Sequence, residues 1–207
     1  MKRIKQALLP LVLLLCLCAC APKAAELPKL PDETGIAPYD LSEEESYLLQ
    51  ALGLENSAKV FAFRAPEETV SIQLKVYQLD EELDWVQTDA GDISNGPGSA
   101  SGPLNGTFAL RLSPDCSMNL YFNCLGRIAY QTDPSSSAQR FTSSARVFLT
   151  DFQEIKLGEE IPVALLAYDF GSSIEALTVG DYFAPASLGG IDLVQAVTLT
   201  FSDTALT

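Results

Sequence analysis

Acidic side chains have the clearest chemical potential in this chain, because a pair of carboxylates can hydrolyse a glycosidic bond without a His. The 207 residues include 27 Asp and Glu and no His. The lack of His excludes Ser-His and Cys-His nucleophile pairs and His-liganded metal sites. The candidate groups are Glu67/Glu68, Asp80–Asp84, Glu159/Glu160 and Asp181/Asp192. All but the last are neighbours at turn-like positions, where acids are usually solvated, so no residue is predicted to be catalytic.

Residues 89–96, Asp-Ala-Gly-Asp-Ile-Ser-Asn-Gly, invite comparison with a calcium loop. The loop of an EF-hand places oxygen ligands at alternate positions. Gly91 and Ile93 occupy those positions here. A turn rich in Gly and Asn explains the residues better. The sequence therefore predicts no metal and no cofactor.

Three aromatic residues are candidate ligand contacts. Tyr77 and Tyr121 fall on the polar parity of their predicted strands, which points their rings outward. Trp85, the only Trp, shares parity with Leu83, and a large aromatic at the end of a hairpin is more often a lid on the core. Aromatic residues are enriched at binding surfaces. Both a stacking surface for a ligand and plain core packing therefore remain open for these residues.

Two cysteines follow the N-terminal segment, and we predict that both are buried free thiols. Cys116 and Cys124 share one strand parity. If a single strand joins them, their ends lie about 26 Å apart at ~3.3 Å per residue. A disulfide needs Cα atoms within roughly 7 Å of each other. A bridge would require a tight turn at residues 118–120, where the turn chemistry is poor.

The N-terminus is basic and then apolar. Lys2, Arg3 and Lys5 precede residues 7–21, which contain no charge. This run is shorter than the roughly 20 residues that a membrane-spanning helix needs. A positive start, a short apolar middle and small residues at the end are typical of a secretory signal.

The end of the run, Leu17-Cys18-Ala19-Cys20, resembles the lipobox of bacterial prolipoproteins. Leu17, Ala19 and Cys20 match that pattern, and Cys18 departs from it at the permissive second position. The resemblance implies diacylglyceryl transfer to the Cys20 sulfur and removal of residues 1–19 as a signal peptide. Two acyl chains suffice for stable anchoring, so we expect an extracytoplasmic protein on the cell membrane. The alternative is ordinary secretion, with cleavage two residues further on.

Composition divides the remainder into a tether and one domain. Residues 20–40 are predicted to be an extended tether because they contain four prolines, Pro22, Pro28, Pro31 and Pro38. Residues 41–207 have the length of a single domain with one core. The net charge of −14 argues against a nucleic-acid partner, because neutralisation of phosphate supplies that affinity.

The domain is predicted to be mainly β. Ser42-Glu43-Glu44-Glu45 is a capping box that opens one short helix, which Gly53 ends. Hydrophobic alternation then predicts about nine strands, at residues 70–77, 83–88, 108–112, 120–130, 146–152, 154–157, 161–168, 174–179 and 193–202. The strand at 161–168 is apolar on both faces and should be central. Many short strands with frequent turns favour an antiparallel β-sandwich.

Two long polar loops interrupt the strands. Residues 91–106, from Gly91 to Gly106, and residues 132–145 are rich in Gly, Pro or Ser. Loops of this length are either functional or disordered, and the lack of aromatic residues favours disorder in the first.

Function is predicted mainly by exclusion. We expect a non-catalytic module that binds a protein, peptide or carbohydrate ligand in the envelope or outside the cell. A structural partner of an envelope complex and a carboxylate-dependent hydrolase are the alternatives.

Overall fold

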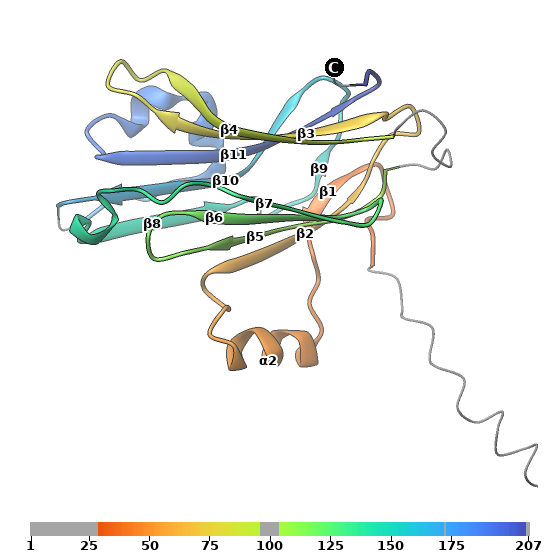
Figure 1. Cartoon of the computed structure of the whole chain (residues 1–207), viewed down its shortest axis with the longest axis horizontal. Helices are drawn as coiled ribbons and strands as arrows, with labels where there is room; N and C mark the ends of the chain where they lie inside the picture. Colours follow the sequence, from red (N-terminus) through yellow and green to blue (C-terminus); the bar gives the residue numbers. More distant parts are fainter. Residues whose placement is uncertain (1–28, 96–103, 172, 206–207) are drawn as a thin grey trace, which may run out of the picture.

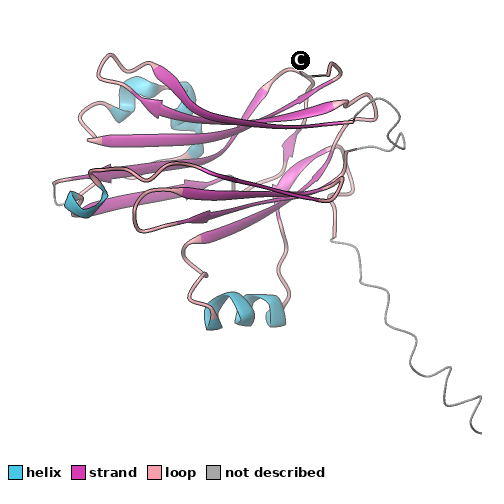
Figure 2. Cartoon of the chain, viewed as in Figure 1, coloured by secondary structure: helices cyan, strands magenta, loops and turns pink. Residues whose placement is uncertain are grey.

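The computed structural model describes residues 29–95, 104–171 and 173–205, so the signal segment and Cys20 lie outside the described residues. The chain forms two antiparallel sheets, with strand orders β7-β6-β5-β2-β1-β9 and β4-β3-β11-β10-β8. Figure 1 shows them as two layers, and Figure 2 shows that strands dominate the described chain. The prediction of a mainly β, antiparallel protein is confirmed.

The elements fall into three groups. The six-stranded sheet contains β1 (Gly35–Pro38), β2 (Ala58–Arg64), β5 (Gly106–Leu112), β6 (Met118–Asn123), β7 (Arg127–Gln131) and β9 (Gln153–Glu154). The five-stranded sheet contains β3 (Ser71–Leu79), β4 (Trp85–Ser94), β8 (Ser143–Phe148), β10 (Glu160–Asp169) and β11 (Leu193–Ser202). The helical elements are α2 (Glu43–Ala51) and the 3-10 helices η2 (Ala138–Arg140), η3 (Val179–Phe183) and η4 (Pro185–Leu188).

The main core lies between the two sheets. Ile72, Leu74 and Val76 of β3 are buried on one face, because successive side chains of a strand alternate. Phe63 of β2 meets Phe201 of β11 edge to face, with ring centroids 5.5 Å apart. Full burial of each such side chain contributes roughly 1.5–3 kcal/mol, so contacts of this kind hold the layers together.

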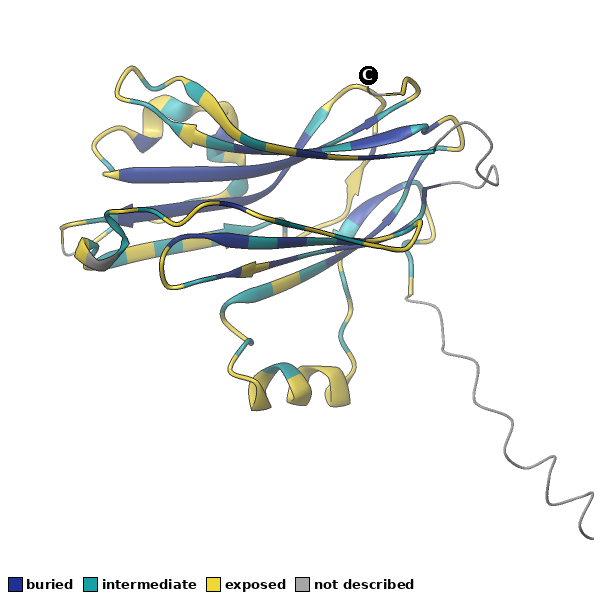
Figure 3. Cartoon of the chain, in the orientation of Figure 1, coloured by how far each residue is buried: buried dark blue, intermediate teal, exposed yellow. Residues whose placement is uncertain are grey.

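The strand β10 is central, as its apolar sequence predicts. It pairs with β11 on one side and β8 on the other, and its residues 161–168 are all buried. A second, smaller cluster covers its outer face: Tyr182 and Leu188 pack there against Leu165 and Ala196. Figure 3 shows this as continuous burial along β10 and β11. The chain between these two strands therefore folds back as a cover over the sheet.

The folded body begins earlier than the sequence predicts. Strand β1 lies within residues 20–40, which were expected to be tether, and its Gly35 and Ile36 are buried. Pairing with β2 and with β9 holds it in the sheet. Four prolines favour extended backbone but do not prevent it from joining a sheet, which is why composition alone was misleading here.

The strand count of eleven differs from the predicted nine. Residues 120–130 form the antiparallel pair β6 and β7 rather than one strand, with Gly126 at a φ of +118° between them. Residues 174–178 are not a strand but lead into η3. Within the predicted loop, residues 91–94 belong to β4 and Gly106 opens β5, whereas residues 96–103 lie outside the described part of the chain.

The helix α2 has the predicted capping box. The Ser42 hydroxyl accepts a hydrogen bond from the Glu45 amide at 3.2 Å, and the Glu45 carboxylate accepts one from the Ser42 amide at 2.8 Å. However, no residue of α2 is buried. Tyr47, Leu48 and Leu52 are 71%, 58% and 62% exposed, and Figure 1 shows the helix standing off the sheets.

Cys116 and Cys124 are both free thiols in the structure. Cys116 is buried in the turn before β6, at a φ of +62°, and Cys124 is half-buried after that strand. The six residues of β6 separate them by about 20 Å at ~3.3 Å per residue. Only Cys116 is buried, whereas both thiols were predicted to be, and Cys116 lies in a turn rather than on one strand with Cys124.

Candidate functional site

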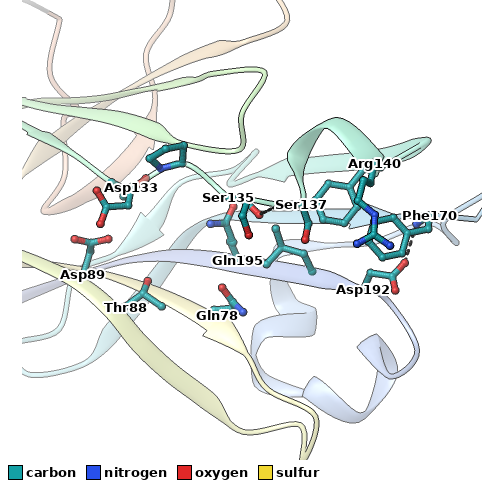
Figure 4. Close-up of a pocket in the computed structure, with 15 residues that line it drawn as sticks. Gln78, Thr88, Asp89, Asp133, Ser135, Ser137, Arg140, Phe170, Asp192 and Gln195 are labelled. Atoms are coloured by element: carbon teal, nitrogen blue, oxygen red, sulfur yellow. Dashed lines mark hydrogen bonds between the residues drawn. The ribbon is translucent and has the colours of Figure 1, made fainter.

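A polar pocket of about 560 Å³ opens between the layers at one end of the body (Figure 4). Its floor comes from the five-stranded sheet and its roof from the loop that follows β7. The floor residues used below are Gln78, Thr88, Asp89 and Gln195, and the roof residues are Asp133, Ser135 and Ser137. This volume lies within the range of small-molecule sites.

The floor is polar because the inward-facing residues of two strands, which are apolar in the core, become polar at the ends of those strands. Gln78 continues the inward row of Val76 along β3, and Gln195 continues the row of Val197 along β11. The two glutamines are directly opposite each other in the antiparallel register. Two amides therefore lie side by side on the floor, but only Gln195 is buried, at a position where packing alone would favour an apolar residue, whereas Gln78 is exposed.

Gln195 is the strongest single sign of a binding site. Its side chain is 9% exposed, and its Oε1 atom has no hydrogen-bond partner. A buried acceptor without a partner costs about 1–3 kcal/mol. Such a group in a native structure calls for an explanation, and a bound ligand is one, because Gln195 also lines the pocket.

A β-bulge turns two consecutive residues of β4 toward the pocket. Val76 is paired with Asp89 and Tyr77 with Gln87, so Thr88 is the extra residue. In a regular strand Thr88 and Asp89 would point to opposite faces, but both line the pocket. Bulges often re-aim side chains in this way next to functional sites.

The ring of Tyr130 joins the two layers beside the pocket. A Cβ atom at Gly91 would lie 2.4 Å from this ring, so only glycine allows the approach. The Tyr130 hydroxyl also donates to the Asp92 carbonyl at 2.7 Å. Asp89 lies two residues before Gly91, and Asp133 lies three residues after Tyr130. The contact therefore fixes the floor and the roof relative to each other.

Asp89 and Asp133 face each other across the pocket (Figure 4). Burial and the nearby carboxylate of Asp133 raise the pKa of Asp89 above its ordinary value. Both effects disfavour the ionised form, and burial is the larger. The pair can attract a positively charged group or accept hydrogen bonds from hydroxyls.

The opposite end of the pocket is aromatic. The rings of Phe141 and Phe170 stack with centroids 4.9 Å apart, and the guanidinium of Arg140 lies 4.6 Å from the Phe170 centroid. Asp192 accepts a hydrogen bond from the Phe170 amide at 2.7 Å, which fixes the start of this wall. The pocket thus combines a flat, partly apolar wall with polar groups that can both donate and accept.

The predicted contact residues do not form one surface. Tyr77 and Trp85 do come together, with ring centroids 6.5 Å apart, but Tyr182 covers them and stacks on Trp85 at 5.2 Å. The indole of Trp85 donates to the Tyr182 carbonyl at 2.9 Å. Tyr121 lies on the outer face of the other sheet, beneath Arg127. Of the two interpretations left open by the sequence, packing is the one seen for Tyr77 and Trp85.

Several of the acids considered from the sequence have structural partners. Glu160 accepts hydrogen bonds from the hydroxyls of Tyr77 at 2.6 Å and Tyr182 at 2.7 Å, and from the Lys75 ammonium at 3.2 Å. Although burial raises its pKa, these donors outweigh burial and hold the pKa of Glu160 below its ordinary value. Its neighbour Glu159 points to solvent and makes a 4.0 Å ion pair with Lys156.

Asp80 and Asp181 likewise have partners within their own turns. Asp80 accepts from the amides of Glu82 and Asp84 within their turn. Asp181 accepts from the Thr178 amide at the start of η3, whereas Asp192 lines the pocket. Sequence reasoning missed Asp133 and Gln195 as site residues. A glutamine on an inward row was a visible signal for Gln195, but nothing local places Asp133 opposite Asp89.

The chain matches no family model, and no curated protein or solved structure is detectably similar to it. Within the described residues, no helix has the length and apolar character needed to span a membrane. The same residues contain no group of three or more His, Cys, Asp or Glu that could hold a metal ion.

Proposed function

We propose that the protein is a lipid-anchored, extracytoplasmic binding protein that holds a carbohydrate in the pocket between its sheets and does not turn it over. The anchor part of this proposal rests on the lipobox resemblance at Cys20. The fold part is that the two layers form a β-sandwich, an architecture whose loops gather at its ends and frequently bind ligands there. The pocket lies at such an end.

The unpartnered Oε1 of Gln195 is the observation that supports binding most directly. A sugar hydroxyl can donate to this atom and accept from another group, because a hydroxyl does both. The amide of Gln78 and the hydroxyls of Ser135 and Ser137 also line the pocket. The stacked rings at the far wall offer the apolar surface that a sugar ring also presents. The lining therefore favours a ligand rich in hydroxyl groups over an apolar one.

Replacement of Gln195 by Met tests this proposal. Met has a similar length and removes the orphan acceptor, so the variant should be at least as stable as the wild type. Its affinity for a bound saccharide should fall at least tenfold. The measurement is isothermal titration of the full-length lipoprotein in detergent with a panel of neutral and amino oligosaccharides.

Thr200→Val is the matched control. Thr200 is on the same strand, its hydroxyl is also buried without a partner, and it does not line the pocket. It should raise stability in the same way and leave binding unchanged. If Gln195→Met binds saccharide as well as the wild type does, or if no saccharide in the panel binds the wild type, the proposed function fails.

The second candidate is an assembly partner, which the exposed face of α2 favours. Tyr47, Leu48 and Leu52 are exposed on a well-capped helix, and the acids of its first turn flank them. That charge disfavours an anionic membrane surface and a symmetric second copy of the same helix. It fits a protein groove that is apolar inside and has Lys and Arg at its rim.

Changing Tyr47, Leu48 and Leu52 together to Gln tests this candidate. Folding should be unaffected because all three side chains are exposed. The wild type should form a salt-sensitive crosslink from α2 to an envelope protein. If the triple variant loses this crosslink and still binds saccharide, assembly is supported as a separate role. An unchanged crosslink would remove it.

A further inference from the structure

Three acceptor groups gather at one end of the pocket. Thr88 and Asp89 come from the bulge of β4, and Asp133 comes from the loop after β7. In Figure 4 the two carboxylates point toward each other and Thr88 lies next to Asp89. The Thr88 hydroxyl already donates its proton to the Val76 carbonyl at 3.3 Å, so toward a ligand it can act only as an acceptor.

Within the part of the chain that the structure describes, no cation of the pocket lies beside the negative charge of Asp89 and Asp133. Arg140 is the only cation among the described residues that line the pocket, and it stacks on Phe170 at the other end. Two carboxylates that share a site repel each other unless a cation lies between them. The raised pKa of Asp89, which follows from burial and from Asp133, is the expected consequence.

Building on the proposed function, we propose that Thr88, Asp89 and Asp133 form a subsite for a primary ammonium group, so that the preferred ligand is an amino sugar. An ammonium group has three N–H donors and no acceptor, which matches a set of three acceptors with net negative charge. The unpartnered Oε1 of Gln195, more than nine-tenths buried in the same pocket, independently indicates that a ligand enters there.

A divalent metal fits this subsite less well. Calcium takes six to eight oxygen ligands. Asp89 and Asp133 supply two carboxylates, and no third acidic residue joins them in a metal-binding group within the described chain. The ring and hydroxyls of an amino sugar would in addition reach Gln195 and the aromatic wall, which a bare ion would leave unused.

Paired oligosaccharides provide the test. Full-length lipoprotein in detergent is titrated with a glucosamine tetrasaccharide and with its fully N-acetylated form, which has the same ring count but no ammonium group. The wild type should bind the amine form at least tenfold more tightly. Asp89→Asn and Asp133→Asn should each reduce that preference to about twofold or less.

Asp203→Asn is the charge-matched control. Asp203 is exposed and does not line the pocket, so this variant should keep the preference. If Asp89→Asn does not fold, Thr88→Val supplies a second variant, for which a weaker loss of the same preference is expected. Circular dichroism of each variant verifies folding before titration.

The other outcomes each have one meaning. Equal binding of the two forms by the wild type overturns the ammonium subsite and leaves the proposed function standing. Failure of both forms to bind overturns both proposals. If the wild type binds calcium without saccharide and Asp89→Asn does not, the subsite is a metal site instead. If the wild type releases reducing ends from the oligosaccharide and Asp89→Asn does not, Asp89 is an acid catalyst. Either result overturns the ammonium subsite.

Discussion

The ring of Tyr130, on one sheet, lies against the backbone of Gly91, on the other, at a distance that leaves no room for a side chain. The hydroxyl of the same ring donates to the carbonyl of Asp92 at 2.7 Å. This contact spans the layers next to the pocket. It is therefore the part of the fold that determines how far Asp89 stands from Asp133.

Gly91→Ala should separate the layers at this point. A Cβ atom there would meet the Tyr130 ring, and such overpacking typically costs about 1–3 kcal/mol. Chemical denaturation should show that loss, and saccharide binding should weaken with it. Gly53→Ala is an informative comparison, because Gly53 has open space around it and a φ of +66°, so it tests backbone strain alone. Unchanged stability of Gly91→Ala would contradict the described contact.

Glu160→Gln should destabilise the cover over β10. The carboxylate accepts from Tyr77, Tyr182 and Lys75, and a hydrogen bond to a charged group contributes about 1.5–3 kcal/mol, so a loss of about 2 kcal/mol is expected. Glu159→Gln, one residue away and exposed, should change stability by less than about 0.5 kcal/mol. Urea unfolding at pH 7 compares the two, and equal effects would argue against the described network.

The same carboxylate predicts acid sensitivity. The pKa of Glu160 is lower in the folded state than its ordinary value, so its contribution is fully present above the unfolded pKa and is lost as pH falls through the folded pKa. Wild-type stability should therefore decline below about pH 4.3, the ordinary value for Glu. Glu160→Gln should show a shallower decline over that range. A parallel decline in both proteins would show that other acids dominate.

Asp89→Asn should have the opposite effect on stability. The folded pKa of Asp89 is raised, so its ionisation opposes folding above the unfolded pKa, and the folded state gains stability as pH falls. The variant should therefore have a higher denaturant midpoint than the wild type at pH 7, and the difference should vanish near pH 3. A variant that is less stable at pH 7 would show that Asp89 makes a stabilising contact instead.

Both thiols of the folded domain should be free. Alkylation in denaturant without a reductant should add two labels, one each at Cys116 and Cys124. Mass analysis of peptides distinguishes these labels from any at the acylated N-terminus. Burial raises the pKa of each thiol, so alkylation of the native protein should be slow by comparison. Labels that appear only after reduction would reveal a disulfide.

Cys20 should be the site of acylation. An alkynyl fatty acid should label the wild-type protein, and Cys20→Ser should be unlabelled and released from the membrane. Cys18→Ser is the matched control, since Cys18 occupies the permissive position of the motif and should not affect labelling. Persistent labelling of Cys20→Ser would refute the anchor.

Patterns within a few residues were sufficient for the local structure. Ser42 and Glu45 cap α2 as predicted, because the two groups of a capping box are three residues apart and require no other part of the chain. Strand β10 is central as predicted, because apolar residues on both of its faces must be covered. The same reasoning failed for residues 120–130, where two strands of similar composition meet at a turn.

The tertiary structure alone decided the site. Tyr77 and Glu160 are 83 residues apart in sequence, and only the pairing of β3, β11 and β10 makes them hydrogen-bonded neighbours. Tyr77 faces away from the main core, as its parity predicts, but parity does not reveal that η3 covers it. The pairing of Asp89 with Asp133 likewise depends on a bulge in one sheet and a loop from the other. Alternation fixes which face of a strand a residue occupies, whereas strand order, register and layer packing fix what lies opposite it.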